Sequence, residues 1–316
     1  MIDKRLLASS VVRNAALSTV DFVDKGGGLV FRTCSHERSR VVAQIGTASS
    51  VYALQAALLL APHVAAVDVN MGCPVHFSTS GGMGSALLSK PEAARDILVT
   101  LRRCLPPELP VTAKIRLLPT RAATLEFAKM VESCGVAALA VHGRYVSQKP
   151  RDAAHWAEIA AVSAAVSCPV IANGDVFSYS DFAAVRRATG AASAMAARGA
   201  QWNASIFRAA GLLPAAEVRR DYAAACVAWD NPVSNSKYCL REMLIADVGL
   251  TGAEGASLAA AKTLADVAAM YGLNASGHDR QRADSASPGE GARAHASEGE
   301  NAGEGEGRAS KRACVA

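Results

Sequence analysis

The stretch VTAKIRLLPTRAATLEFAKMVESCGVAALAVHGR, residues 111–144, contains one complete unit of the fold. It predicts a short strand of β-branched and small apolar residues (111–116), an Ala- and Leu-rich helix (120–134) and a second strand (138–143). The same alternation extends outward in both directions. The other predicted strands are 41–46, 65–70, 169–174 and 193–199, and the other predicted helices are 49–60, 91–104, 154–166, 180–188 and 201–210. Six successive strand–helix units are typical of a parallel sheet buried on both faces.

A chemically capable side chain stands at the carboxyl end of every predicted strand. These residues are Gln44, Asp68 with Asn70, Lys114 with Arg116, His142, Asn173 and Arg198. A closed barrel gathers such groups because its active site is built at the carboxyl rim, whereas a doubly wound sheet binds its ligand at one switch point, normally beside a glycine fingerprint. No G-x-G-x-x-G follows a strand here, and the GGMG cluster at 81–84 lacks the Lys-Ser/Thr of a P-loop. We therefore predict a TIM (β/α)8-type barrel.

The alternation of strands and helices stops after Gly211, so we predict three domains or segments. Residues 1–211 form the barrel, and 212–273 form a small all-α domain with helices over 213–230, 236–248 and 257–272. The low-complexity segment 274–316, with Val315 as its one branched aliphatic residue, is predicted to be a disordered tail. The basic residues of the helical domain are Arg219, Arg220, Lys237 and Arg241. They suit phosphate contacts or a solvated helix face equally well.

Charge and cysteine usage set limits on partners and location. The chain has 316 residues and a net charge of +5, which becomes +6 for residues 1–273 alone. This mild excess is compatible with a polyanionic partner and equally with an ordinary soluble enzyme. The eight cysteines are at least 13 residues apart, so no zinc spacing exists and we predict no metal site. Reduced thiols predict an intracellular protein, in the cytoplasm or alternatively the nucleus or mitochondrion, and no apolar run reaches the ~18 residues of a membrane span.

Cys73 lies between Gly72 and Pro74, directly after a strand and at the start of the longest strand-to-helix connection (68–92). A free cysteine is usually a small buried hydrophobic residue. We assign that role to Cys34, Cys104, Cys134, Cys168 and Cys226. For Cys73 the strand-end position favours catalysis instead, and both a nucleophile and a general acid remain open.

The cations at the strand ends indicate a phosphate and a polar ring system. Lys114 and Arg116 are two apart on one strand and therefore point the same way. A lysine inside a barrel is costly to bury unless it meets an anion or a polar cofactor edge. Arg198 directly precedes a predicted helix, whose first N–H groups favour a phosphate. We interpret the set as an FMN site, with Lys114 and Gln44 toward the isoalloxazine and Arg198 toward the phosphate.

Five motifs in order resemble those of the tRNA-dihydrouridine synthases. They are VNMGCP with GGMGSALL (69–88), VTAKIR (111–116), AVHGR (140–144), VIANGD (170–175) and AARGAQWN followed by SIF (196–207). The segments STVDFV (18–23) and VFRTCSHERSRVVAQIGT (30–47) are similar to the eukaryotic type-two branch, which modifies the D-loop uridine at tRNA position 20. The resemblance covers roughly 2–272.

This resemblance implies a role for each matching residue. It implies FMN binding by Gln44, Lys114, His142, Asn173, Gly174, Asp175, Ala197 and Arg198, and substrate binding by Asn70, Arg116, Arg144 and Lys237. Cys73 matches the proton donor. The implied reaction uses NADPH (or NADH) to reduce FMN, passes hydride from flavin N5 to C6 of a flipped-out uracil, and protonates C5 from Cys73. The helical domain would bind tRNA, and we expect a monomer.

The sequence departs from the family at its start. The family begins with a strand ending in Ala-Pro-Met, a helix and a second strand, whereas the pattern here starts at Ile2-Asp3. We therefore expect an N-terminally incomplete barrel, with Met1 an internal methionine of the family pattern. Two alternatives follow: a catalytically silent tRNA-binding remnant, or a flavin barrel acting on a free pyrimidine.

Overall fold

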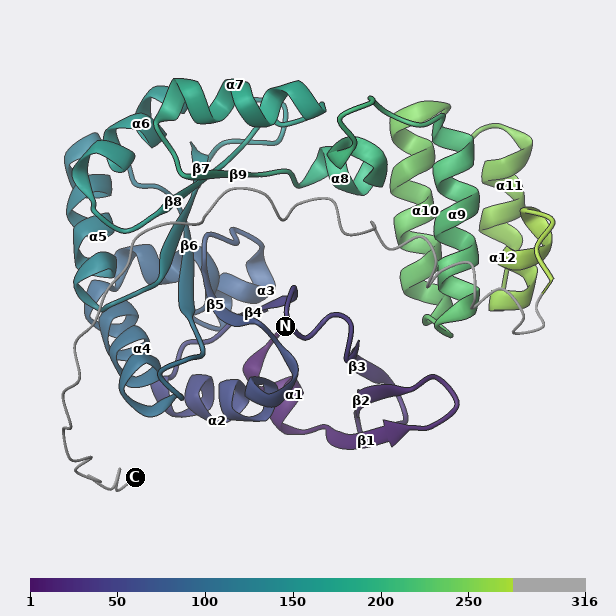
Figure 1. The fold of residues 1–316 in the computed structure, drawn as a ribbon, viewed down its shortest axis with the longest axis horizontal. Helices are drawn as coiled ribbons and strands as arrows, with labels where there is room; N and C mark the ends of the chain where they lie inside the picture. The colour runs from purple at the N-terminus through teal and green to yellow at the C-terminus, as the bar shows by residue number, and fades with distance from the viewer. Residues whose placement is uncertain (275–316) are drawn as a thin grey trace, which may run out of the picture.

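A six-stranded parallel sheet forms the centre of the larger, left-hand part of the molecule (Figure 1). The computed structural model describes residues 1–274. The strands are β4 (Val42–Ile45), β5 (Ala66–Met71), β6 (Val111–Leu117), β7 (Ala138–Tyr145), β8 (Val170–Asn173) and β9 (Ser193–Met195). Each strand pairs with the next one in sequence, in the order β4-β5-β6-β7-β8-β9. A doubly wound sheet would reverse its strand order at a switch point, so this single direction of winding confirms a partial TIM barrel.

Five helices cover the outside of the curled sheet, and their ends agree closely with the sequence prediction. They are α2 (Ser50–Leu60), α4 (Pro91–Cys104), α5 (Arg121–Ser133), α6 (Trp156–Ala165) and α7 (Tyr179–Thr189). The Ser49 and Thr120 side chains cap the starts of α2 and α5, and α7 ends at Gly190 in the left-handed conformation. Local capping therefore explains why the pattern locates these helices so well.

The helix predicted over 201–210 is wrong. The chain instead forms α8 (Arg198–Trp202) and the 3-10 turn η3 (Ala204–Phe207). Asn203 separates them because its backbone is extended, at φ −151°, and its side chain accepts from Ser205 N at 3.0 Å. Its amide also donates to the carbonyl of Leu213 at 2.9 Å. A local side-chain hydrogen bond thus competes with the helix.

The sheet presents its polar residues on the concave side. Along β6, Val111, Ala113, Ile115 and Leu117 are buried in the core between the sheet and its helices. Lys114 and Arg116 alternate with them and are half-buried on the opposite face. The prediction that these two cations point the same way is confirmed, and they face the interior of the half-barrel.

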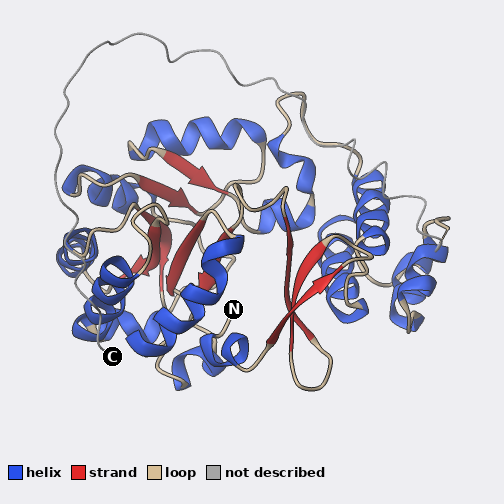
Figure 2. Cartoon of the chain, turned by 60° about the horizontal axis from the view of Figure 1, so that its bottom comes forward, coloured by secondary structure: helices blue, strands red, loops and turns tan. Residues whose placement is uncertain are grey.

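A second, antiparallel sheet was not predicted. It consists of β1 (Ser10–Asn14), β2 (Thr19–Val23) and β3 (Leu29–Cys34), in that order, and lies beside α1 (Asp3–Leu7), as Figures 1 and 2 show. Asp24 closes the β2–β3 turn by accepting from the N–H groups of Gly26 and Gly28. Phe22 is fully buried and anchors this sheet to the barrel.

The first residues of the chain pair with the edge of β4. The Met1 amine donates to the Gln44 carbonyl at 2.6 Å, and Gly46 N donates to the Met1 carbonyl at 2.6 Å. Asp3 N donates back to the Gly46 carbonyl at 3.1 Å, and the buried Asp3 carboxylate accepts from Thr47. This short segment therefore covers part of one sheet edge, and β9 forms the other edge.

The helical domain has its own small core. It contains α9 (Ala215–Ala228), α10 (Val233–Asp247), α11 (Ala253–Ala260) and α12 (Leu264–Met270), and its buried residues include Leu240, Leu244, Leu258 and Val267. The single helix predicted over 257–272 is wrong, because Thr263 and Asp266 form a capping box that starts α12. Within residues 1–274, no helix has the length and apolar character to cross a membrane. Apart from Asn274, the predicted tail lies outside the described residues.

Helix α8 and the antiparallel sheet both contact the helical domain. Helix α8 packs against α10. Arg32 of β3 forms a two-point ion pair with Asp21 and also donates to the carbonyls of Trp229 and Asp230 at the end of α9. One guanidinium thus connects the antiparallel sheet with the helical domain.

Candidate active site

The strand register brings the predicted rim residues side by side. Gln44 pairs with Asp68 across β4 and β5, Asp68 with Thr112 across β5 and β6, and Asn70 with Lys114 one step further along. On the other side, Arg116 pairs with His142 and His142 with Asn173. Since side chains on neighbouring parallel strands at matched positions share a face, the polar groups form a continuous row along the rim.

Four of these residues form a chain of hydrogen bonds that we call the amide relay: Gln44, Asp68, Asn70 and Thr112. Asp68 accepts from Thr112 Oγ1 at 2.6 Å and from Gln44 Nε2 at 2.8 Å, and Gln44 Oε1 accepts from Asn70 Nδ2 at 2.7 Å. An ionised carboxylate can only accept, so Asp68 fixes which way the Gln44 amide faces, and Gln44 then fixes Asn70.

The relay ends at Cys73. Asn70 Oδ1 accepts from the backbone N–H of Cys73 at 2.9 Å and from that of Gly72 at 3.1 Å. On the other side, Ser85 N donates to the Cys73 carbonyl at 2.9 Å. A Cβ at Gly84, which has φ +61°, would come within 2.5 Å of that carbonyl, so glycine is required there. The Gly/Ser-rich connection after Cys73 contains the short helices α3 (His76–Ser80) and η2 (Gly84–Ser89), and Cys73 itself is half-buried.

Lys114 has the features expected of a side chain that binds a cofactor. Its ammonium makes no hydrogen bond with any described residue. Burial lowers the pKa of Lys114 to about 8, while Asp68, and Cys73 when ionised, act to raise it. Burial also raises the pKa of Asp68, against the opposing effects of Thr112, Gln44 and Lys114. A desolvated ammonium without a hydrogen-bond acceptor favours binding of a polar or anionic group.

The opposite side of the rim contains the arginine cluster: His142, Arg144, Asp175 and Arg198. Arg144 is 3% exposed, and it donates to the Asp152 carbonyl at 2.6 Å, to His142 Nε2 at 3.1 Å, and to Asp175. Arg198 donates to the same Asp175 oxygen at 3.2 Å. The hydrogen bonds from Arg144 oppose burial and hold the pKa of Asp175 below its usual value. Asp175 is thus shared by two arginines.

His142 is neutral in this cluster. Burial lowers its pKa to about 3, helped by Lys114, Arg116 and Arg144. An arginine can only donate, so His142 Nε2 is the acceptor and the ring proton lies on Nδ1. His142 therefore offers one N–H donor at the rim.

A cavity of about 210 Å³ opens beside the arginine cluster. Its lining includes Asn173, Gly174, Ala197 and Phe177 in addition to the cluster itself. Gly174 has φ +133°, and a Cβ there would come within 2.6 Å of the Ala154 Cβ, so the turn needs glycine. Asn173 donates to the Met195 carbonyl at 2.9 Å and joins the two strand ends. The eight residues predicted to bind FMN thus lie between the middle of a strand, as Lys114 does, and the first residues beyond its carboxyl end, as Arg198 does.

The residues present fit a flavin mononucleotide. The cavity volume suits the phosphate end of such a molecule, and Arg198 binds Asp175 through a single nitrogen, which leaves its other donors for an anion. Lys114 supplies a cation further along the same face that has no hydrogen-bond partner among the described residues. Within residues 1–274, no group of three or more His, Cys, Asp and Glu side chains is arranged to bind a metal ion.

The structure separates the four residues predicted to bind substrate. Asn70 and Arg116 are at the rim, where Arg116 Nη1 donates to the Tyr145 carbonyl at 3.2 Å. Arg144 is buried in the arginine cluster. Lys237 lies in α10, where its ammonium binds the carbonyls of Ala259 and Ala261 at the end of α11. Lys237 is therefore not brought together with the rim residues.

Several site residues were not identified from the sequence. Thr112 completes the amide relay. Its position two residues before Lys114 on one strand could have indicated from the sequence that both side chains share a face of the sheet. Arg198 lies over the rings of Phe177 and Trp202, at 5.2 and 5.7 Å, and these two rings stack at 5.4 Å. That contact joins Phe177, in the loop before α7, to Arg198 and Trp202 of α8, so spacing alone could not indicate it.

A parallel barrel sheet with a thiol, a buried lysine and an arginine-lined cavity at its carboxyl rim defines a TIM-barrel protein with a rim active site. The family model for dihydrouridine synthase (Dus) matches residues 12–272, and the chain belongs to that family.

Named relatives agree with this assignment. The tRNA-dihydrouridine(20) synthase [NAD(P)+] of Schizosaccharomyces pombe is 34% identical over 253 residues, 77% of this chain and 53% of the relative. Its namesake in Saccharomyces cerevisiae is 38% identical over 194 residues, 58% of this chain and 50% of the relative. The tRNA-dihydrouridine(16) synthase of Cupriavidus necator is 39% identical over 145 residues, 46% of this chain and 44% of the relative. The chain spans about half the length of the curated relatives it matches, and the predicted family and its eukaryotic type-two branch are confirmed.

Proposed function

We propose that this protein is an FMN-dependent tRNA-dihydrouridine synthase that reduces a D-loop uridine, at position 20, with NADPH (or NADH) as reductant. The observation that carries the proposal is the Cys73 thiol, which the amide relay holds at the rim near the buried ammonium of Lys114. Two fungal relatives named for position 20 support the choice of uridine.

When bound, the flavin supplies the two-electron reduction. The chain's own residues do the rest. Lys114 and Gln44 bind the polar edge of the ring system, and His142 adds its Nδ1–H as a neutral donor. Arg198 would hold the phosphate beside the loop of Asn173, Gly174 and Ala197, while Asp175 orients the Arg198 guanidinium.

Cys73 donates the proton to C5 of the uracil ring. Its backbone N–H is bonded to Asn70, and its carbonyl accepts from Ser85, so the thiol is presented from a fixed turn. A general acid needs this kind of positioning because proton transfer requires hydrogen-bond reach to the reacting atom. Asn70 and Arg116, at the same rim, then contact the flipped-out nucleotide.

The purified protein tests the proposal. We expect flavin absorbance bands, and dihydrouridine at position 20 after incubation with NADPH and tRNA transcript that lacks the modification, measured by mass spectrometry. A protein that binds no flavin when FMN is supplied in excess would contradict the proposal.

A second function is favoured by one observation. Among residues 1–274 the parallel sheet has six strands, with β4 and β9 at its edges. A protein of this shape that binds tRNA without reducing it is the alternative. It predicts retention of tRNA with no NADPH oxidation, and dihydrouridine formation rules it out. Turnover of free uracil would instead indicate a barrel acting on pyrimidines.

A further inference from the structure

Two cavities outside the rim share a wall in the antiparallel sheet. One, of about 640 Å³, is lined by Arg13, Arg38 and His63, and the other, of about 450 Å³, by His36, Arg40 and Trp229. Thr19, Thr33 and Cys34 line both cavities. Thr19 and Cys34 are a cross-strand pair of β2 and β3, so the cavities lie on the two sides of that pair. We call the two cavities together the basic trough.

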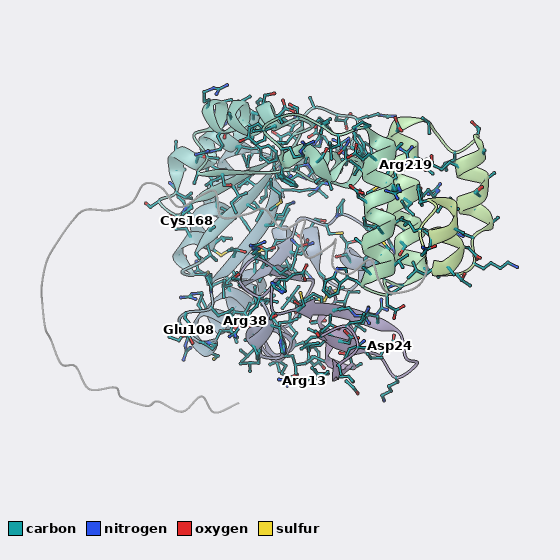
Figure 3. The ribbon with its side chains drawn as sticks, turned by 45° about the vertical axis from the view of Figure 1, so that its right-hand side comes forward. Arg13, Asp24, Arg38, Glu108, Cys168 and Arg219 are labelled. Atoms are coloured by element: carbon teal, nitrogen blue, oxygen red, sulfur yellow. The ribbon has the colours of Figure 1, made fainter. Side chains whose placement is uncertain are left out.

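Three arginines of the trough lack acidic partners among the described residues. Within residues 1–274, Arg13, Arg38 and Arg40 form no ion pair with a carboxylate, and all three are exposed. Figure 3 shows Arg13 and Arg38 on the same side of the molecule. The pKa of His63 is lowered by burial first and then by Arg38 and Arg13, so both arginines lie close enough to His63 to disfavour its charged form.

Among the described residues, Glu37 is the one carboxylate that lines either cavity, and Arg32 of the second cavity is already paired with Asp21. The arginines without acidic partners stand in two cavities that share a wall. Such an arrangement suits a ligand with negative charges repeated along its length better than it suits one compact anion. The trough also contains a buried hydroxyl, Thr33 Oγ1, that has no hydrogen-bond partner within residues 1–274.

The far end of the trough identifies the class of ligand. The second cavity is lined by Trp229 and Asn231, at the junction of α9 and α10 in the helical domain. An aromatic ring beside a row of cations is how proteins bind the stacked bases and backbone of RNA. An acidic peptide would use the cations but has no base to stack on the ring.

The trough is separate from the rim. Pro62 and His63 stand directly before β5, whereas Asp68, Asn70 and Cys73 stand at and beyond its carboxyl end. We propose that the basic trough binds the phosphate backbone of the tRNA substrate, as a second contact distinct from the base-reducing site. This inference rests on the proposed function, which supplies tRNA as the RNA.

The test compares two double variants that each remove two positive charges. Arg13→Ala/Arg38→Ala changes the trough, and the matched control Arg103→Ala/Arg187→Ala changes exposed arginines of α4 and α7. Affinity for unmodified tRNA transcript is measured by fluorescence anisotropy between about 50 and 200 mM KCl. The slope of log K against log salt is negative, and each phosphate that the protein no longer neutralises reduces its magnitude by about 0.7–0.9. We therefore expect the magnitude to fall by about 1.5 in the trough variant.

The control should keep the wild-type slope, and circular dichroism melting should show both variants folded. Equal slopes for the two variants would overturn the inference, even if the wild-type protein forms dihydrouridine. If the wild type forms none but the trough variant still shows the lower slope, the proposed function fails and RNA binding by the trough stands.

Sodium triphosphate distinguishes RNA from a compact anion. We expect triphosphate to compete only weakly with tRNA. The affinity for tRNA should fall no further than it does in KCl of the same ionic strength. Strong competition that the Arg38→Glu variant abolishes, with no change in the tRNA slope, would mean a site for a compact anion and overturn the inference.

Discussion

The amide relay and the arginine cluster stand on opposite sides of one rim and treat charge differently. In the arginine cluster, Asp175 is shared by Arg144 and Arg198, so the charges are largely compensated inside the protein. In the relay, Asp68 is surrounded by hydrogen-bond donors, while the nearby ammonium of Lys114 has no acceptor among the described residues. On the first side the charges are largely paired before any ligand binds, and Arg198 keeps further donors for an anion. The second side is organised around a polar group that the described residues do not supply.

The largest effect should come from the residue at the end of the relay. Cys73→Ala removes the proposed proton donor, and we expect uridine reduction to fall by about 100- to 10,000-fold. Flavin content and melting temperature should stay at wild-type values, because the backbone bonds of the turn remain. Cys168→Ala is the matched control, and mass spectrometry of tRNA gives the rate. Wild-type activity in Cys73→Ala would refute the proton-donor role.

Arg144→Met removes one of the two arginines that pair with Asp175 in the arginine cluster. It leaves Asp175 with Arg198 and the Ala154 N–H as partners and removes the bond to His142, so we expect the free energy of unfolding to fall by about 3 kcal/mol. Urea denaturation of the flavin-free protein measures it. Arg121→Met, which removes an exposed ion pair with Glu158, should leave the free energy of unfolding unchanged. Equal effects of both substitutions would show that the cluster is not a stabilising unit.

Asp68→Asn tests the relay itself. The new amide can donate to Gln44 as well as accept, so the orientation of Gln44 and Asn70 is no longer fixed, and a displaced Cys73 turn should lower the reduction rate by up to about 100-fold. Thr112→Val keeps the carboxylate and should have a smaller effect. The positioning role also predicts an unchanged apparent KM for tRNA. A raised KM with an unchanged turnover rate would contradict it.

The smallest expected effect is on pH dependence. The Lys114 pKa of about 8 means that the ammonium loses its proton as pH rises past that value, so flavin affinity should be constant below it and decline above it. His142, with a pKa of about 3, should add no change near its ordinary value of 6.5. Since Asp68 raises the Lys114 pKa, Asp68→Asn should move the decline to lower pH. Fluorescence titration of FMN measures the profile, and a decline centred near 6.5 would contradict the assignment.

The lowered pKa of Lys114 also makes the free energy of unfolding depend on pH. The folded protein releases the Lys114 proton near pH 8, whereas the unfolded chain holds it until about its ordinary value of 10.5. The unfolded state therefore binds more protons between these values, so this group makes the flavin-free protein more stable as pH rises through that interval.

The sequence was sufficient for features that depend on local pattern. The apolar alternation of β6 and the capping residues Ser49 and Thr120 locate the strands and helices, and the polar strand ends predict the rim. The antiparallel sheet was missed because β1 is almost wholly exposed and carries no clear alternation. The relay was missed because it depends on the register of β4, β5 and β6, which pairs Gln44 with Asp68. Spacing within one strand does not contain that information.

The bonds from Arg32 to the end of α9 impose an order on folding. Arg32 and Trp229 are 197 residues apart in the chain, with the whole parallel sheet between them. During synthesis at typical rates, the carbonyls that Arg32 binds emerge about 10–40 s after it does. Throughout that interval Asp21 is the one of its hydrogen-bond partners in the folded protein that the guanidinium can reach. The ion pair within the antiparallel sheet can therefore form before the helical domain docks.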